Sequence, residues 1–212
     1  MAKQDRAIRT RRTILEAAAS VFEKQGYQAA TITEILKTAG VTKGALYFHF
    51  QSKEDLAAGV LSEQEPGQGV PPQPTKLQEL VDVGMLLAYR LRTDPLVRAS
   101  VRLTLDHQAH GLDRRGPFLR WSEANQRFLD AAARQGELLP HVNPRATADL
   151  YVGAFAGLQM MSQTLSDYED LAERLSVLQH HLMPSIAMPA VLASLDLAPD
   201  RADRIAETAA AS

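Results

Sequence analysis

Apolar and polar positions along the chain follow the period of an α-helix in nearly every segment, and no segment shows the two-residue alternation of a convincing strand. The segment 6–25 illustrates the pattern: small and large apolar residues recur on one face, and Gly26 then ends the helix. The residues of that face are Ile14, Ala17, Ala18, Val21 and Phe22. The hydrophobic pattern therefore predicts an all-α protein.

The segment 31–55 predicts two short helices joined by a tight turn, followed at once by a third helix. Thr31 and Glu34 have the spacing of a capping box, in which two side chains satisfy unpaired amides at a helix start. Gly40 can take the left-handed conformation that ends a helix. Thr42 and then Ser52 are suitable N-caps for the two helices that follow.

The second short helix, 43–49, has an unusual outer face. Leu46 and Phe50 are placed to point inward, which leaves a small, basic and aromatic set outside: Lys43, Gly44, Tyr47 and His49. A helix-turn-helix whose second helix is short and presents such side chains suits insertion into the major groove of DNA.

Proline and glycine divide the rest of the chain. The first proline is Pro66, and the loop 66–74 that it opens is rich in both residue types, which indicates a boundary. We expect a DNA-binding domain over 1–55 and a second helical domain over 56–212. Further helices are predicted over 52–65, 76–92, from Pro95 onward, 117–135, 144–165, 167–183 (ended by Pro184) and 189–197, with a frayed polar tail.

Composition narrows the class of protein. The chain has no cysteine, which excludes disulfides and thiolate metal sites and agrees with a cytoplasmic location. The net charge is −2, yet residues 1–55 hold nine Lys or Arg against six Asp or Glu. A basic N-terminal segment followed by an acidic remainder is typical of a DNA-binding protein with a second function. Four arginines of the first helix are either a solvated face or a contact to DNA phosphates or the minor groove: Arg6, Arg9, Arg11 and Arg12.

Motifs for catalysis and cofactors are absent. The sequence has no nucleophile elbow, phosphate-binding loop or dinucleotide fingerprint, so we predict no enzymatic activity and no cofactor. His107 and His110 have a spacing that could hold a metal, but the sequence offers no evident partner ligands, and we predict no metal site.

Trp121, the only tryptophan, has two interpretations. It is either part of a solid core or part of a pocket, because polar residues interrupt the apolar stripes around it: Asn125, Gln159, Ser162 and Gln163. Gly153 and Gly157 allow close helix packing, within a subunit or across a dimer. A leucine stripe over 171–182 is likewise either core or dimer seam.

A family resemblance rests on residues 8–60, which resemble the DNA-binding domain of TetR-type transcriptional repressors. The matching positions are Phe22, Gly26, Tyr27, Thr31, Ile35, Ala39, Gly40, Val41, Gly44, Leu46, Tyr47, Phe50, Lys53 and Leu56. The variant VTKGALYFHFQSKEDLA, with DRRGPFLRW and ELLPHV in the body, is similar to the γ-butyrolactone autoregulator receptors of Streptomyces. That similarity extends to about residue 197.

This resemblance implies a homodimeric repressor that binds a palindromic operator and is released by a γ-butyrolactone-type signal, in control of secondary metabolism. The DNA-binding residues it implies are Thr33, Thr42, Lys43, Gly44, Tyr47, His49 and Lys53. Among them Lys43 is our candidate for reading guanine, Lys53 for holding a phosphate. The ligand-binding residues it implies are Trp121, Gln64, Gln159 and Ser162. The helix from Ser52 would transmit the signal.

Three alternatives stay open from the sequence. A regulator of the same fold could sense a butenolide or an antibiotic. An all-helical enzyme acting on a lactone would need a catalytic set in the body. A ligand-buffering or purely structural dimer would leave the surface from Lys43 to Lys53 without a purpose.

Overall fold

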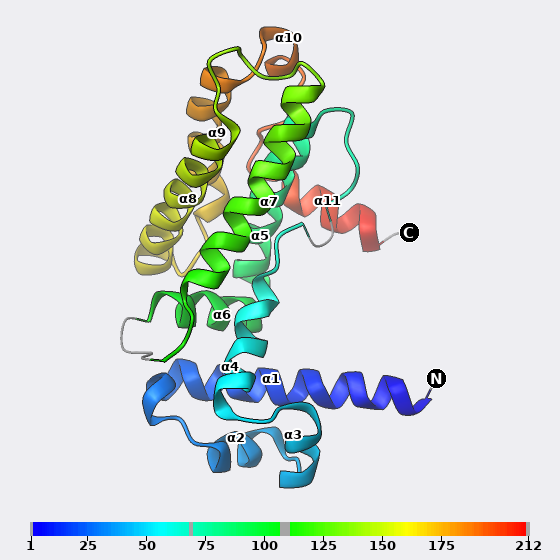
Figure 1. The fold of residues 1–212 in the computed structure, drawn as a ribbon, viewed down its shortest axis with the longest axis vertical. Helices are drawn as coiled ribbons and strands as arrows, with labels where there is room; N and C mark the ends of the chain where they lie inside the picture. The colour runs from blue at the N-terminus through cyan, green and yellow to red at the C-terminus, as the bar shows by residue number, and fades with distance from the viewer. Residues whose placement is uncertain (1, 68–69, 107–110, 211–212) are drawn as a thin grey trace. The chain divides into compact units, whose positions relative to one another are not determined.

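A computed structural model describes residues 2–67, 70–106 and 111–210. These residues form eleven α-helices, one 3-10 turn and no strand, apart from an isolated bridge between Leu138 and Ala187 (Figure 1). The all-α prediction is confirmed. The pair His107 and His110 lies outside the described residues.

The chain divides into two compact units. Unit 1 comprises residues 1–64 and 94–117, and unit 2 comprises 65–93 and 118–212. The helices of unit 1 are α1 (Ala2–Ala29), α2 (Ile32–Ala39), α3 (Lys43–His49), α4 (Lys53–Leu61), the 3-10 turn η1 (Ser62–Gln64) and α6 (Pro95–Leu105). Unit 1 thus includes α6 with the helix-turn-helix, although residues 65–93 of unit 2 lie between η1 and α6 in the sequence.

The core of unit 1 forms where α1 packs on the three short helices and on α6. Its largest side chains are almost fully buried: Ile14, Leu15, Phe22, Ile35, Leu46, Phe50, Leu56, Leu96 and Leu103. Gly26, with φ 77°, interrupts the regular turns of α1, as the sequence predicts. Gly59 lets the backbone of α4 lie close to the ring of Phe50, because a Cβ at this position would be only 2.9 Å from that ring.

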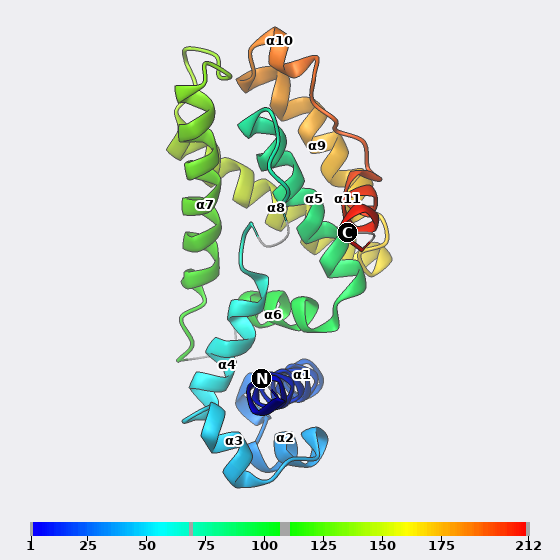
Figure 2. The same cartoon turned by 90° about the vertical axis from the view of Figure 1, so that its right-hand side faces the viewer.

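Unit 2 is built around α5 (Lys76–Thr93), which is buried on all sides from Leu77 to Ala88. Around it lie α7 (Arg115–Arg134), α8 (Pro144–Ser166), α9 (Leu171–Ile186), the short α10 (Pro189–Leu192) and α11 (Arg201–Ala210) (Figure 2). The first three residues of α7, 115–117, belong to unit 1, and unit 2 resumes at Phe118.

A carboxylate from beyond α7 caps the start of α5. Glu137 is buried and accepts hydrogen bonds from the backbone N–H groups of Lys76 (2.8 Å) and Leu77 (2.9 Å). The first N–H groups of a helix have no partner within it, and negative charge is favourable there. The C-terminal end of α7 is thereby tied to the first turn of α5.

The start and end predicted for the helix over 167–183 are wrong. Asp167 has φ 49° and donates its N–H to the Ser162 carbonyl, so it ends α8 instead of starting α9. Helix α9 begins at Leu171 and continues past Pro184 to Ile186. The proline is tolerated because it lies in the last turn, where the next turn still closes from Ala187 N–H to the Met183 carbonyl at 2.8 Å.

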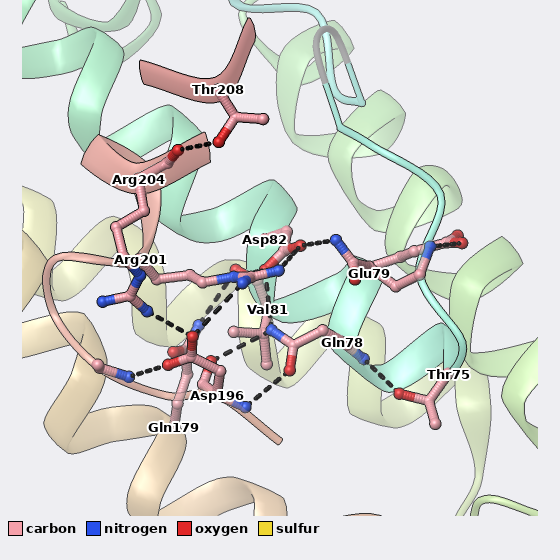
Figure 3. Close-up of polar contacts among 12 residues, drawn as sticks. Thr75, Gln78, Glu79, Val81, Asp82, Gln179, Asp196, Arg201, Arg204 and Thr208 are labelled. Carbon is pink, nitrogen blue, oxygen red and sulfur yellow. Dashed lines mark hydrogen bonds and ion pairs between the residues drawn. The ribbon is translucent and has the colours of Figure 1, made fainter. Parts of the chain in front are cut away.

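The frayed tail is also a wrong prediction. Residues 201–210 form α11, and the helix predicted over 189–197 is only the single turn Pro189–Leu192. Figure 3 shows the reason: Arg201 forms an ion pair with Asp82 on α5, and Arg204 pairs with Asp196. The pair of Arg201 and Asp82 joins residues 119 positions apart, which a local pattern does not reveal.

Candidate DNA-binding surface and ligand cleft

The helix-turn-helix forms from the capping contacts that the sequence predicts. Glu34 N–H donates to the Thr31 hydroxyl at 3.2 Å, and Thr31 N–H donates to the Glu34 carboxylate at 3.1 Å. Gly40 has φ 63° and donates to the Leu36 carbonyl. The Thr42 hydroxyl accepts from Ala45 N–H at 3.2 Å and begins α3. Short local hydrogen bonds therefore define both helices and the turn.

Helix α3 has one buried face and one exposed face. Leu46 is fully buried, and Phe50 just after the helix is nearly so. Lys43, Gly44 and Tyr47 are exposed, as are Thr42 before the helix and Thr33 on α2. The Lys43 ammonium lies 5.8 Å from the centre of the Tyr47 ring, so the two side chains share one edge of the helix.

Phe48 is the exposed residue that the sequence reasoning missed. Its side chain is 78% exposed, the highest value among the large apolar residues that the structure describes. It meets His49 edge-on, with ring centres 4.9 Å apart, and His49 itself is only half-buried. The helical spacing could have revealed this residue, because Phe48 follows Gly44 by four positions and so shares its outer face.

Lys53 is held against the end of α1. Its ammonium donates to the Gln28 carbonyl at 3.1 Å and lies 4.5 Å from the centre of the Tyr27 ring. The Tyr27 hydroxyl donates to Glu54 at 3.3 Å. Burial, together with the Glu54 carboxylate, raises the pKa of Tyr27 to about 12. These contacts hold the start of α4 against the end of α1.

The four arginines of α1 fall into two pairs. Arg11 lies 5.2 Å from the Phe50 ring centre and 3.9 Å from Glu63, and Arg12 pairs with Glu16 and Asp94. These two therefore hold α1 within unit 1. Arg6 and Arg9, nearer the N-terminus, are exposed, and no carboxylate of the described residues pairs with them.

Gln64 is buried in unit 1, at the end of the turn that follows α4. Its amide nitrogen donates to the Thr104 hydroxyl at 2.7 Å and to the Ser100 carbonyl at 3.4 Å, both on α6. The Ser100 hydroxyl in turn donates to the Leu61 carbonyl at 3.3 Å. Helix α6 is thus hydrogen-bonded to the end of α4 inside unit 1.

The other three predicted ligand residues lie in unit 2. Trp121 is half-buried on α7, and Gln159 is buried on α8. Ser162 is fully buried, and its hydroxyl donates to Asp170 at 2.6 Å. Arg174 also binds Asp170, and these hydrogen bonds hold the pKa of that carboxyl well below its usual range. Ser162 therefore has a structural partner at the junction of α8 and α9.

A cleft of about 280 Å³ lies in unit 2 along α7. Non-polar residues line it together with charged residues from the first turn of α5 and from α7. The lining residues are Pro66, Gly67, Lys76, Glu79, Ala124, Arg127, Phe128 and Ala131. A hollow that combines non-polar and polar groups can hold a small organic molecule.

Helix α8 presents an apolar stripe that the described residues of the chain leave exposed. Gly153 and Gly157 lie in this stripe, and a Cβ at either would meet nothing within 4 Å. The large apolar residues of the stripe are Leu150, Met160, Met161 and Leu165. The glycines therefore do not serve close packing within the subunit.

The described residues hold neither a metal-binding cluster nor a membrane-spanning helix. None of their His, Asp and Glu side chains gather in threes that could hold a metal. Among the same residues, no helix is both long and apolar enough to cross a membrane.

Fold and surface together define a helix-turn-helix DNA-binding protein with a second helical unit. Residues 14–60 match the family described as bacterial regulatory proteins, tetR family. The A-factor receptor protein of Streptomyces griseus is 40% identical over 195 residues, which cover 92% of this chain and 70% of that protein. The chain belongs to the TetR family of transcriptional regulators, which bind operator DNA as dimers and respond to small molecules.

Solved structures agree with this assignment. TylP, a TetR regulator from Streptomyces fradiae, superposes with a TM-score of 0.87 at 47% identity, covering 97% of this chain and 92% of that one. A γ-butyrolactone receptor superposes with a TM-score of 0.67 at 28% identity, covering 96% and 98%. The resemblance inferred from the sequence is confirmed.

Proposed function

We propose that this protein is a cytoplasmic transcriptional repressor that controls secondary metabolism. A γ-butyrolactone-type signal releases it from its operator. The similarity to the A-factor receptor along nearly the whole chain carries this proposal. It extends through the body, where a regulator binds its signal, and is not confined to the helix-turn-helix.

DNA reading is assigned to the exposed side of α3. Lys43 lies at the first turn of the helix, exposed and beside Tyr47, where its amine can donate to guanine O6 and N7. Thr33, Thr42, Gly44, Tyr47 and His49 complete the surface, and Phe48 adds an apolar side chain able to touch a thymine methyl. Lys53 and the exposed pair Arg6 and Arg9 are assigned to phosphates.

Ligand binding is assigned to the side of α7 that carries Trp121. Phe128 lies seven positions after Trp121, about two turns along, and lines the cleft. Gln159 and Ser162 on α8 supply polar groups in the same unit, although the Ser162 hydroxyl is already bonded to Asp170. Gln64 is assigned to ligand binding and also to the transmission of the signal to the DNA-binding helices, because its amide is hydrogen-bonded to α6.

Release of DNA then follows from the connections of α6. This helix follows α5 directly in the chain, and within unit 1 it is hydrogen-bonded to Gln64 and Leu61 at the end of α4. A ligand that favours another position of α6 would therefore displace α4 and the recognition helix. To take an operator from mostly occupied to mostly free, the ligand must bind the released state more tightly by about 5 kcal/mol.

The dimer contact is assigned to the apolar stripe of α8 with the neighbouring face of α9. A two-fold symmetric dimer places the same surface of both subunits in contact, and Gly153 and Gly157 allow the two helices to approach closely. Val177 on α9, which is 58% exposed, extends the apolar surface.

One experiment tests the function as a whole. Operator DNA selected from a random pool is bound to the purified protein, and release is followed in gel shifts with matched γ-butyrolactones, butenolides and antibiotics. We expect release at the lowest concentration with a γ-butyrolactone. Release by a butenolide or antibiotic alone would contradict the proposed signal, and failure to select any operator would contradict the repressor itself.

A further inference from the structure

Arg102 on α6 forms an ion pair with Glu23 on α1. The two side chains are 36% and 32% exposed, so the pair is partly withdrawn from water. Helix α6 also contributes apolar side chains to the core that it shares with α1, namely Leu96, Ala99 and Leu103. Apolar contacts have no preferred direction, whereas an arginine–carboxylate pair has a defined geometry. The ion pair therefore adds a fixed point to the packing of α6 on α1.

The other end of α6 is also tied to α1. Asp94, the N-cap of α6, has its Oδ2 atom 3.7 Å from Nη2 of Arg12. The two ion pairs are about 16 Å apart along α1 and about 12 Å apart along α6. Two separated fixed points set the direction of a helix as well as its position, so we expect α6 and α1 to move together.

Gln25, two positions after Glu23, connects the opposite side of α1 to the helix-turn-helix. At about 100° per residue these two side chains face away from each other, and α1 lies between α6 and α2 (Figure 1, Figure 2). The Gln25 amide donates to Glu34 Oε1 at 3.1 Å. The other oxygen, Oε2, accepts from Thr31 N–H at 3.1 Å in the capping box. Glu34 thus joins α1 to the first turn of α2.

We propose that α1 transmits movement between α6 and the DNA-reading helices, through the contacts of Arg102 with Glu23 and of Gln25 with Glu34. These four are positioning residues, because they act on the reading surface of α3 through the placement of α1 and α2. The route is separate from the hydrogen bonds that join α6 to the end of α4. The inference concerns operator binding and does not depend on the identity of the signal.

Reciprocity makes this coupling measurable with DNA alone. If a movement of α6 changes the helix-turn-helix, then DNA that holds the helix-turn-helix must also restrain α6. A restrained helix opens less often, and amide hydrogen exchange reports such opening for each element. We expect operator to slow exchange over 95–105 by at least about fivefold in the wild type, which is a common size for coupling between two sites.

The test compares the full-length protein free and saturated with operator that has been selected from a random pool. Glu23→Gln removes the charge that holds α6, and Gln25→Leu removes the bond to α2, and both leave the sequence of α6 unchanged. The matched control Asp203→Asn breaks the ion pair with Arg92 in unit 2, in which the carboxylate is similarly exposed, at 38%. Mass spectrometry follows exchange over 95–105 and 32–49, expressed as the ratio of free to bound.

We expect the ratio over 95–105 to fall below about twofold in Glu23→Gln and in Gln25→Leu, and to keep its wild-type value in Asp203→Asn. Over 32–49 the operator should slow exchange in all three variants, because the DNA-reading surface is intact. Glu23→Arg combined with Arg102→Glu restores the ion pair with its charges exchanged, and this double variant should recover the ratio over 95–105.

A structural role alone gives a different result. Lost stability raises exchange over 95–105 in free and bound protein alike, and their ratio stays the same. An unchanged ratio in both Glu23→Gln and Gln25→Leu would therefore overturn the inference and assign the coupling to α4. A charge exchange that recovers the melting temperature without the ratio would overturn it as well. So would a wild-type protein in which operator leaves exchange over 95–105 unaffected.

Discussion

Arg201 holds Asp82 with two parallel hydrogen bonds, from Nε to Oδ1 and from Nη2 to Oδ2, each 2.9 Å long. The side chain of Asp82 is fully buried, and it also accepts from Gln78 at 2.8 Å and from Gln73 at 3.0 Å (Figure 3). Charge-assisted pairs in this two-pronged geometry are among the strongest hydrogen bonds in proteins. The last helix of the chain is thus bonded to the central helix of unit 2.

Replacement of Arg201 by alanine should therefore destabilise the protein. The change leaves a buried carboxylate without its counter-ion, and we expect a loss of about 3–5 kcal/mol in the free energy of unfolding. Urea denaturation followed by circular dichroism measures this loss. The double variant Asp82→Asn with Arg201→Met should recover much of the stability, because neither charge is then left alone. A loss below 1 kcal/mol for Arg201→Ala would show that α11 contributes little.

Lys43→Ala should weaken operator binding without unfolding the protein. If the amine reads a guanine, affinity for the selected operator falls by about 5- to 150-fold, corresponding to 1–3 kcal/mol, and sequence preference relaxes at one position. Gel shifts at fixed salt measure both effects. The control Arg134→Ala removes an exposed cation from the end of α7 in unit 2. A uniform loss over all DNA sequences would make Lys43 a phosphate contact instead.

Phe48→Ala should weaken operator binding and leave stability nearly unchanged. An exposed side chain contributes little to folding, so the free energy of unfolding should change by less than about 0.5 kcal/mol. Binding should fall most for operators that carry thymine opposite α3, because the thymine methyl is the apolar group that the Phe48 ring can contact in the major groove. Operators with uracil in place of thymine test this directly. Equal loss on both DNAs would contradict the methyl contact.

Trp121→Ala should keep DNA binding and lose the response to the signal. The indole is half-buried, and it lies on the face of α7 that continues to Phe128 at the cleft. We expect the ligand concentration for half release to rise at least tenfold, with operator affinity within twofold of wild type. Titration of the preformed protein–operator complex measures both. Unchanged ligand response would assign Trp121 to the core.

Gly157→Leu should impair dimerisation and not folding. Apart from the neighbouring turns of α8 itself, no described atom lies within 4 Å of a Cβ at this position, and replacing glycine inside a helix favours the helix by up to about 1 kcal/mol. Analytical ultracentrifugation should show dissociation at concentrations where wild type is dimeric. Glu123→Leu, at an exposed position of α7, adds the same side chain outside the stripe. A dimer as stable as wild type would place the contact elsewhere.

The accuracy of the sequence predictions depends on the range of the interactions involved. The capping box at Thr31 and Glu34 and the left-handed Gly40 depend on neighbours within four residues, and the structure has both. The ion pair of Arg201 with Asp82 and the hydrogen bonds of the buried Gln64 join residues 36 or more positions apart, and no periodicity indicates such partners. The start of α9 differs from the prediction for another reason: Asp167 takes a left-handed conformation, which is uncommon for a residue other than glycine, and ends α8 there.

The cap that Glu137 places on α5 limits how α7 can move at the cleft. It fixes the C-terminal end of α7 at Lys76 and Leu77, beside the cleft residue Ala131. The hydroxyl of Ser122 also binds Asp149 on α8, so α7 is held in its N-terminal half as well. We therefore expect an entering molecule to displace the side chains of α7 between these two ties, where the cleft lies, more than either end of the helix.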